Sequence, residues 1–272
     1  MTYRDLRTLE DYAQVVELER VIWGPGYDDV VPVSILAISV LRGGILIGAF
    51  SGARMVGFVY SLPGIKHGKP TQWSHMLGVI DEYRRTGLGL RLKLLQRERA
   101  LEMGLDLIEW TFDPMQAMNA HFNFAKLGGV VEEYAVNFYG ESTSALHRGT
   151  PTDRVVLSWR ISAPHVVRRL EDPSALRARS HDVTEAPIVN TTTMEGEWRK
   201  TRAIDLTLKD RRVWIEIPTG FTELLQRAPE RALAWRLDVR QMFEEYFAKG
   251  YRAVDFVLQR DAGFGRYLLA KD

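Results

Sequence analysis

The spacing of apolar residues divides the first part of the chain into helices and strands. Thr8 and Asp11 form a capping-box pattern, and the apolar residues that follow recur at helical spacing, which predicts a first helix. Short apolar runs bounded by glycine, proline or polar residues predict strands. After the first helix, the predicted order is a helix at 33–41, strands at 45–50 and 55–62, a loop at 63–70, a strand at 73–79, a helix at 87–103, a strand at 105–112, a helix at 115–127, and strands at 130–139 and 154–161.

The remainder of the chain falls into two parts of different character. Residues 164–202 are polar and carry three spaced prolines, which indicates a linker or a long excursion. Beyond them, the pattern predicts a strand at 212–217, a long helix from Pro229 to Gly250, and strands at 254–258 and 266–270. We therefore expect an α/β layered fold with a domain at residues 1–163, the linker or excursion at 164–202, and a small strand–helix–strand–strand unit at 203–272 that packs on the first domain.

Charge and composition narrow the class of protein. The 272 residues include 36 Lys and Arg against 35 Asp and Glu, and this net charge of +1 argues against general binding of nucleic acid. Cysteine is absent, which excludes disulfides, cysteine-ligated zinc, iron–sulfur clusters and a cysteine-linked acyl-enzyme. The histidines do not combine at metal-ligand spacing, so we expect no metal.

No segment of the sequence predicts secretion or membrane insertion. The first ten residues have no apolar core of signal-peptide length. The most apolar stretch, residues 30–50, is broken by Pro32 and by two consecutive glycines, and it falls short of a membrane span. We therefore expect a cytoplasmic protein with no membrane partner.

The most informative stretch runs from Ser74 to Gly89, where an apolar strand enters a turn rich in arginine and glycine that opens a helix. The first N–H groups of a helix lack intrahelical partners and lie at the positive end of its dipole. Gly87 and Gly89 remove side chains, and Arg84 and Arg85 add positive charge, so the turn predicts a cradle for phosphate. The alternative is a strand–turn–helix joint whose glycines only allow close packing. The turn matches neither a Walker loop nor a dinucleotide fingerprint.

The same residues resemble a known motif. Arg84-x-x-Gly87-x-Gly89, preceded by Leu77-Gly78-Val79, is similar to the pyrophosphate-binding motif of the GNAT superfamily of acyl-CoA-dependent N-acyltransferases. Residues 119–128 resemble the family's helix after the fifth strand, and the order of elements up to residue 161 follows the family. Residues 74–79, 110–114 and 151–154 together resemble a bacterial branch of predicted GNAT acetyltransferases with a C-terminal extension. The resemblance implies a mixed, mostly antiparallel sheet flanked by helices, plus a smaller C-terminal α/β unit.

The resemblance also implies a reaction and a binding site. In the family, an amine attacks the thioester of a bound acyl-CoA directly, without a covalent enzyme intermediate. The acyl group is acetyl or larger, and the acceptor expected here is a small primary amine such as an amino acid. The implied pantetheine site is the backbone of Leu77, Gly78 and Val79, the implied pyrophosphate site is the turn of Arg84, Arg85, Thr86, Gly87, Leu88 and Gly89, and Asn119 matches a family position that contacts the CoA arm.

A general base is needed to take a proton from the attacking amine. The candidate is His75, which matches the place of a base-relay histidine in serotonin N-acetyltransferases and which period two puts on one strand face with Trp73, Leu77 and Val79. The alternative role for His75 is a structural, hydrogen-bonded histidine. The second candidate base is Asp113 at the end of the next strand, whose alternative role is a helix N-cap before proline.

One departure from the family keeps other functions open. The position where many relatives place a proton-donating tyrosine falls on Phe124, which we expect to be core packing, and Tyr134 and Tyr139 are the nearby hydroxyls. A non-catalytic CoA-binding or regulatory module is therefore an alternative, as is an enzyme acting on a protein or peptide amine. The helix at 87–103 is apolar on two sides, so we expect the C-terminal unit or a second subunit in a homodimer to cover one of them.

Overall fold

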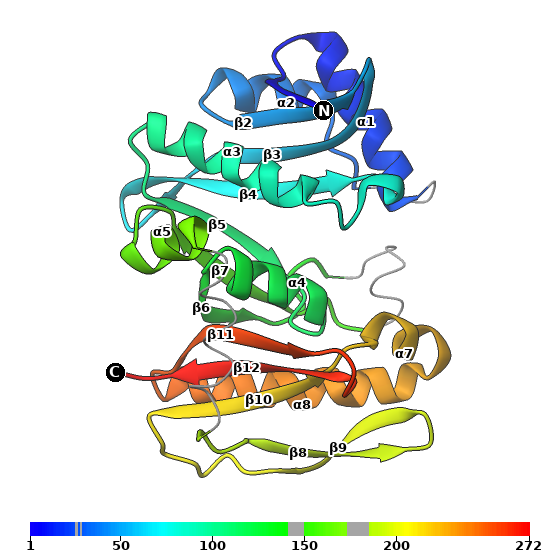
Figure 1. Cartoon of the computed structure of the whole chain (residues 1–272), viewed down its shortest axis with the longest axis vertical. Helices are drawn as coiled ribbons and strands as arrows, with labels where there is room; N and C mark the ends of the chain where they lie inside the picture. Colours follow the sequence, from blue (N-terminus) through cyan, green and yellow to red (C-terminus); the bar gives the residue numbers. More distant parts are fainter. Residues whose placement is uncertain (25–26, 28, 141–149, 173–184) are drawn as a thin grey trace. The chain divides into compact units, whose positions relative to one another are not determined.

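Figure 1 shows the computed structural model of the chain, which describes residues 1–24, 27, 29–140, 150–172 and 185–272. The chain forms two compact units. Unit 1 holds Met1–Trp110 and Arg160–Ser162, and unit 2 holds Thr111–Trp159 and Ala163–Asp272. The boundaries between these units differ from those expected from the sequence pattern, which lie at residues 163 and 203.

Unit 1 is built on a mixed sheet whose strands are hydrogen-bonded in chain order. Neighbouring strands from β1 to β4 pair antiparallel, whereas β4 and β5 pair in parallel. The sequence pattern does not predict β1, a four-residue strand with no apolar run. The five strands are β1 (Thr2–Asp5), β2 (Ile45–Ser51), β3 (Arg54–Lys66), β4 (Lys69–Val79) and β5 (Leu107–Phe112), the last of which ends in unit 2.

Helices cover both faces of the unit 1 sheet (Figure 1). The first helix, α1 (Leu9–Trp23), begins with the predicted capping box, in which the side chains of Thr8 and Asp11 each accept a backbone N–H of the other residue. The second, α2 (Val33–Leu41), has the bounds that the pattern predicts. A single 3₁₀ turn, η1 (Asp81–Tyr83), leads from β4 toward α3 (Leu88–Glu102), which lies over the sheet on the other face from α1 and α2.

The loop predicted at 63–70 is wrong, because β3 and β4 continue through these residues as a hairpin. Their turn is His67-Gly68, and both residues have positive φ (48° and 77°), as a tight two-residue hairpin turn requires. β2 pairs with β3 only as far as Ser61, so Pro63 lies where one edge of β3 has no partner. A proline there removes no ladder hydrogen bond, which is why it does not end the strand.

Unit 2 contains a second set of antiparallel strands. In order of hydrogen bonding they are β7 (Arg154–Arg160), β6 (Val130–Ala135), β11 (Arg252–Gln259), β12 (Phe264–Ala270) and β10 (Arg212–Pro218), and β8 (Asn190–Glu195) and β9 (Trp198–Ile204) form a separate hairpin. The helices are α4 (Ala117–His121), continued by the π-helical turn η2 (Phe122–Lys126), α5 (Pro164–Glu171), α7 (Phe221–Arg227) and α8 (Pro229–Ala248).

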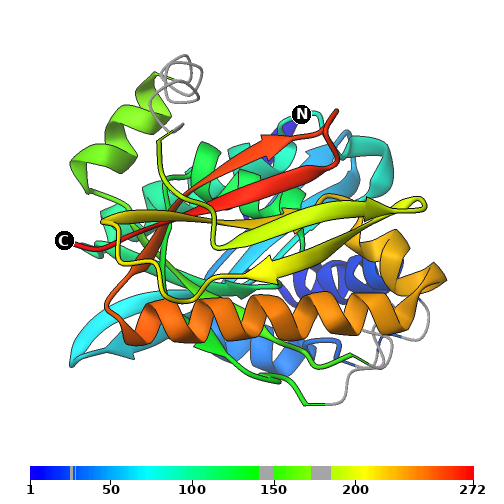
Figure 2. The same cartoon turned by 90° about the horizontal axis from the view of Figure 1, so that it is seen from below.

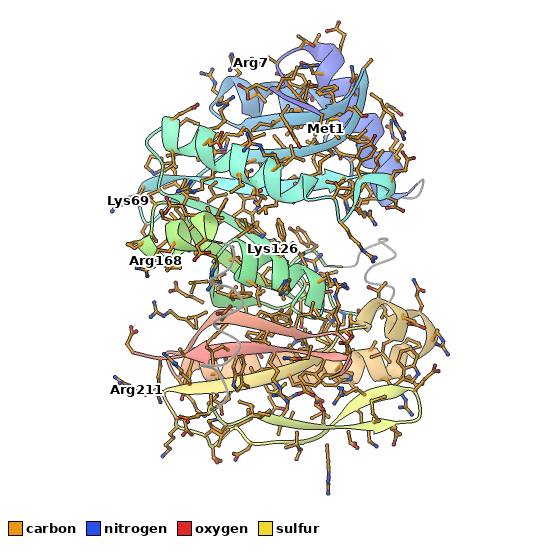
Figure 3. The ribbon with its side chains drawn as sticks, viewed as in Figure 1. Met1, Arg7, Lys69, Lys126, Arg168 and Arg211 are labelled. Atoms are coloured by element: carbon orange, nitrogen blue, oxygen red, sulfur yellow. The ribbon has the colours of Figure 1, made fainter. Side chains whose placement is uncertain are left out.

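The long helix α8 packs along the sheet of unit 2 (Figure 2). Its Phe243 stacks on Tyr134 of β6 and meets Tyr267 of β12 edge to face, with ring centroids 5.8 and 5.1 Å apart. Side chains fill the space between sheet and helices in each unit (Figure 3). The predicted class, a mixed and mostly antiparallel sheet flanked by helices, is confirmed.

The C-terminal part of the chain contains the predicted strand, long helix and two strands in this order, and a short helix that the pattern does not predict, α7, lies between the strand and the long helix. The predicted linker or excursion at 164–202 holds α5, β8 and the beginning of β9, while residues 173–184 lie outside the described part. No helix within the described ranges is long and apolar enough to cross a membrane.

Candidate functional site

The strand β4 separates from β5 soon after the two strands begin to pair. Their ladder consists of Gln72 opposite Ile108 and Trp73 opposite Glu109, so β4 continues from Ser74 to Val79 with β3 on one side only. At the point of separation, the Lys93 ammonium of α3 lies 3.5 Å from the centroid of the Trp110 ring and donates to Ser74 Oγ at 2.9 Å. The sheet of unit 1 therefore opens beside the second half of β4.

The alternation of the antiparallel ladder decides which backbone groups of β4 lie on this open edge. Ile80 N–H donates to Val56 of β3 at 3.1 Å, so Gly78 also faces β3, whereas Leu77 and Val79 face away from it. Within the described part of the chain, the N–H groups of Leu77 and Val79 meet no acceptor. The open edge thus presents two backbone donors two residues apart.

Gly78 has a packing role instead. A Cβ at this position would lie 2.8 Å from both Ile22 Cδ1 of α1 and Phe58 Cε1 of β3. Glycine at position 78 therefore allows α1 to approach the sheet closely.

The open edge of β4 leads to a helix N-terminus without a side-chain cap. Gly87 is the N-cap of α3, has φ of 91°, and provides no side-chain hydrogen bond to the first turn. The N–H groups of Leu88, Gly89 and Leu90 have no acceptor among the described residues. A Cβ on Gly87 would project into open space, so the front of the helix N-terminus is clear. These features suit an anion such as a phosphate.

The two arginines of the turn differ in their partners. Arg84 donates from Nε to the Val79 carbonyl at 3.3 Å and pairs with Asp81 at 2.8 Å, so its side chain folds back onto the end of β4. Arg85 is exposed, adopts a left-handed φ of 66°, and has no partner in the described part of the chain. Left-handed residues other than glycine are strained and concentrate at functional sites. Arg85 is therefore the cation of the turn that is available to a ligand.

His75 occupies a β-bulge. Ser74 lies opposite Ser61 and Met76 lies opposite Tyr60, which leaves His75 as the extra residue on β4. The ring of His75 meets the Tyr60 ring edge to face, with centroids 6.0 Å apart and an interplanar angle of 86°. Tyr60 Oη donates to Ser39 of α2 at 2.7 Å, so His75 lies on the α1 and α2 face of the sheet.

The prediction that His75 shares a face with Leu77 and Val79 is therefore wrong. Leu77 Cδ2 lies 3.7 Å from the position of a Cβ on Gly89 of α3, and Val79 lies with Leu88 of α3 around Gly57. Both side chains thus belong to the α3 face. The extra residue of the bulge shifts the period-two alternation by one, which a sequence pattern alone does not reveal.

The surroundings of His75 favour its neutral form. The side chain is exposed, yet the protein packed around it desolvates the imidazolium and lowers the pKa of His75 below its ordinary value near 6.5. A histidine that is uncharged at neutral pH can accept a proton, as a general base must.

The second candidate base, Asp113, is a buried member of an ion pair within unit 2. Its two carboxylate oxygens accept hydrogen bonds from Arg236 of α8 at 3.0 and 2.9 Å, and Oδ1 also accepts the N–H of Met115 at 2.9 Å. The alternative role as a helix N-cap is wrong, because α4 begins at Ala117 with Gln116 as its N-cap, and the bond from Met115 closes a turn before the helix. No signal in the sequence predicts that Asp113 pairs with Arg236, which lies 123 residues further along the chain.

No tyrosine stands at position 124, and the two nearby tyrosines that could donate a proton differ in their surroundings. Phe124 is fully buried and meets Phe112 and Tyr267 edge to face, which is core packing. Tyr134 Oη donates to Asp153 at 2.8 Å, and burial raises the pKa of Tyr134 far above its ordinary value, so this hydroxyl does not release a proton near neutral pH. Tyr139 is exposed, with its hydroxyl 3.1 Å from Thr111 Oγ1.

The CoA-arm candidate Asn119 lies on α4 of unit 2 and is exposed. Figure 3 labels Lys126, which is also exposed and ends the π-helical turn that follows α4. Among the described residues, no group of three or more His, Asp or Glu side chains is arranged to hold a metal ion.

Unit 1 also has a hollow of about 750 Å³, away from the turn at Gly87. It is lined mainly by apolar residues of α1, α2 and β2 and by Arg99, Glu102 and Met103 at the far end of α3. The length of α3 puts about 20 Å between the hollow and the helix N-terminus. The hollow is therefore no part of the candidate site.

Comparison with known proteins shows a similarity of fold. No protein-family model matches this sequence, and no curated protein matches it. Solved structures that it resembles include an acetyltransferase of the GNAT family from Streptococcus pneumoniae, with 16% identity over 58% of this chain and 97% of that chain and a TM-score of 0.47.

Two further similar structures carry more specific names. Aminoglycoside 6'-acetyltransferase type Ii is 18% identical over 60% of this chain and 99% of that chain, with a TM-score of 0.47. The paia N-acetyltransferase from Thermoplasma acidophilum, solved in complex with coenzyme A, is 16% identical over 59% of this chain and 99% of that chain, with a TM-score of 0.42. These likenesses each span 58–60% of this chain and assign no role to any residue.

Proposed function

We propose that this protein is an N-acyltransferase that moves an acyl group, acetyl or larger, from acyl-CoA to a small primary amine such as an amino acid. The observation that carries the proposal is the junction of β4 and α3. Donors on an open strand edge, Leu77 N–H and Val79 N–H, lead directly to an uncapped helix N-terminus beside Arg85. An acyl-CoA offers the matching groups in the same order: a thioester and amide arm, and then a pyrophosphate.

The chemistry follows from these groups. The amine nitrogen attacks the thioester carbon, so that a C–N bond forms and the C–S bond breaks. The oxygen of the carbonyl becomes negative during the attack, and the backbone N–H groups on the edge of β4 are preorganised donors for it. His75 takes the proton that the nitrogen loses. The thiol of CoA has a pKa near ~8.5, so its thiolate leaves at neutral pH without a dedicated acid in place of Phe124.

His75 is preferred to Asp113 as the base because both oxygens of Asp113 are engaged by Arg236. The roles of Asn119 in binding the CoA arm and of Gly78 in binding pantetheine stay predictions, as does a cytoplasmic location. The acceptor proposed is a small molecule, and no nucleic acid or membrane takes part.

The test is release of free thiol from acetyl-CoA and succinyl-CoA across a panel of amino acids, other small amines and peptides. We expect thiol release that depends on an amine. We expect His75→Gln to lower kcat by about 100-fold or more, the usual contribution of a general base, while the affinity for CoA stays within about twofold. An unchanged kcat would remove His75 from the mechanism. Binding of CoA with no turnover of any amine would favour the non-catalytic module instead.

A further inference from the structure

A buried carboxylate lies on the α1 side of the unit 1 sheet. Glu19 of α1 is fully buried, and its Oε2 accepts the N–H of Val31 at 2.9 Å. Its other oxygen, Oε1, meets no hydrogen-bond donor among the described residues. A buried polar atom without a partner costs free energy, so its presence needs an explanation.

The position of Glu19 on α1 directs it to the sheet near the bulge of β4. Trp23, one turn further along the same helix, meets Phe58 of β3 edge to face with ring centroids 6.2 Å apart. Ile22 packs against Gly78 of β4. The charge of Glu19 acts on Tyr60 of β3 and contributes to raising the pKa of that phenol. Glu19 and His75 therefore both neighbour Tyr60.

A second connection between Glu19 and Tyr60 runs through α2. Val31, whose N–H bonds to Glu19, directly precedes Pro32, the N-cap of α2. The same helix carries Ser39, which accepts the Tyr60 hydroxyl at 2.7 Å. The carboxylate thus secures the start of the helix whose serine holds Tyr60, and the Tyr60 ring contacts His75.

We propose that Glu19 is a positioning residue for His75: in its ionised form it holds the start of α2, and through Ser39 and Tyr60 it fixes the orientation of the His75 ring. The inference rests on the proposed acyl transfer, in which His75 accepts the proton of the amine. Glu19 does not touch the reacting atoms and acts through its neighbours.

The ionisation of Glu19 falls in the neutral range. Burial raises the pKa of Glu19 to about 7, against the opposing effects of the Val31 N–H and the charge of Arg20. The charged and titratable groups that act on it are Arg20 from its own helix and Tyr60 from β3. A charge-assisted hydrogen bond to Val31 becomes an ordinary one when Glu19 takes up a proton, and His75 then loses part of its support.

The test uses the full-length protein with isotope-labelled histidine, and His75→Gln identifies the His75 signals. In wild type, we expect the His75 ring signals to show two inflections with pH, one near 7 from Glu19 and one below ~6.5 from His75 itself. Glu19→Gln keeps the size of the side chain and an acceptor for Val31 N–H, and it should abolish the inflection near 7. Glu10→Gln, a matched loss of charge at an exposed position of α1, should keep both inflections.

Activity provides a second measurement. We expect log kcat/KM of wild type to fall in two stages on the acid side: a step of about fivefold near pH 7 as Glu19 takes up a proton, and a fall with a slope near 1 below the pKa of His75. In Glu19→Gln only the fall with a slope near 1 should remain, and kcat at alkaline pH should be about fivefold lower, the factor between a charge-assisted and a neutral hydrogen bond. Glu19→Asp, which restores the ionisable group, should recover the second inflection.

The outcomes separate this inference from the proposed function. A single His75 inflection in wild type, or identical curves for wild type and Glu19→Gln, would overturn the positioning role even if thiol release is observed. Two inflections together with no amine-dependent thiol release would overturn the proposed acyl transfer and leave the link between Glu19 and His75 standing.

Discussion

Replacing Asp113 by asparagine tests whether this carboxylate is a scaffold group or the base of the reaction. The ion pair it forms with Arg236 is buried, with 7% of the Asp113 side chain and none of the Arg236 side chain exposed. Among the described residues, Arg236 Nε has no partner, and the hydrogen bonds of this guanidinium go to Asp113. Breaking a buried pair by removing one charge costs about 3–5 kcal/mol, because the other charge stays buried and uncompensated.

This magnitude predicts a clear loss of stability. At about 2–4 °C per kcal/mol for a domain of this size, Asp113→Asn should lower the Tm by roughly 6–20 °C. Arg236→Met in the same chain removes the stranded charge, so the double variant should recover much of the loss, with a coupling of at least about 2 kcal/mol. Asp261→Asn, at an exposed position of unit 2, is the control and should stay within about 0.5 kcal/mol of wild type.

The assay combines thermal and urea unfolding of Asp113→Asn, the single variant Arg236→Met, the double variant and Asp261→Asn with thiol release per folded molecule. If Asp113 is a scaffold group, the double variant turns over amine at close to the wild-type rate once it is folded. Two results would refute this reasoning: a Tm of Asp113→Asn within the range of the Asp261→Asn control, or a folded double variant whose kcat has fallen as far as that of His75→Gln. The second result would make Asp113 the base.

Two further predictions concern the two ends of α3 and its buried face. Gly87→Ala and Gly104→Ala both force alanine into a left-handed conformation (φ of 91° and 74°), so each should lower the free energy of unfolding by about 1–2 kcal/mol. Only Gly87→Ala should weaken CoA binding in calorimetry, and equal CoA affinities of the two variants would contradict the cradle. Burial lowers the pKa of Lys93 well below 10.5, so the unfolded chain binds more protons and wild-type stability should rise with pH between that lowered pKa and about 10.4. Lys93→Met should flatten this rise and be at least as stable at neutral pH; parallel stability curves would exclude a titrating Lys93.

Local signals in the sequence predict most elements of the fold. The capping box at Thr8 begins α1, and the apolar run at 33–41 corresponds to α2 residue for residue. The turn at His67-Gly68 is the main local failure, because two prolines and two glycines between residues 63 and 70 have the composition of a loop. The hairpin tolerates the prolines because β3 has an unpaired edge there. Whether a strand has a neighbour on that edge cannot be predicted from the segment itself.

The geometry of the candidate site also depends on contacts between distant segments, which local sequence signals do not predict. The glycines of the turn correctly predict where a helix begins, and its first N–H groups are unpaired as at any helix start. Binding of an anion there stays a prediction. The bulge at His75 depends on how β4 pairs with β3, and the pairing of Asp113 with Arg236 joins residues 123 positions apart. Neither leaves a periodic trace in the sequence. Which arginine of the turn is free likewise depends on Asp81 and the Val79 carbonyl.

Polar residues within two buried helix stripes nevertheless lie beside the proposed site. Beyond the capping residue Asp11, the buried stripe of α1 is interrupted by Glu19, and the buried stripe of α3 is interrupted by Lys93 and Gln96. Lys93 bonds to Ser74 where β4 leaves β5, and Glu19 neighbours Tyr60 beside the bulge at His75. Apolar residues at these positions would stabilise unit 1 more, since burying a charge costs several kcal/mol.

The two buried ionisable groups lie beside the same part of β4, with Glu19 on one face of the sheet and Lys93 on the other. Packing alone gives no reason for two buried ionisable groups to gather where a strand loses one neighbour and bulges away from the other. A site that needs an open strand edge and an oriented imidazole provides that reason, because strain and buried charge are retained where they hold a functional geometry. Glu19 of α1 and Lys93 of α3 thus point to the part of β4 that carries the proposed site, which the pattern of the strand itself does not mark.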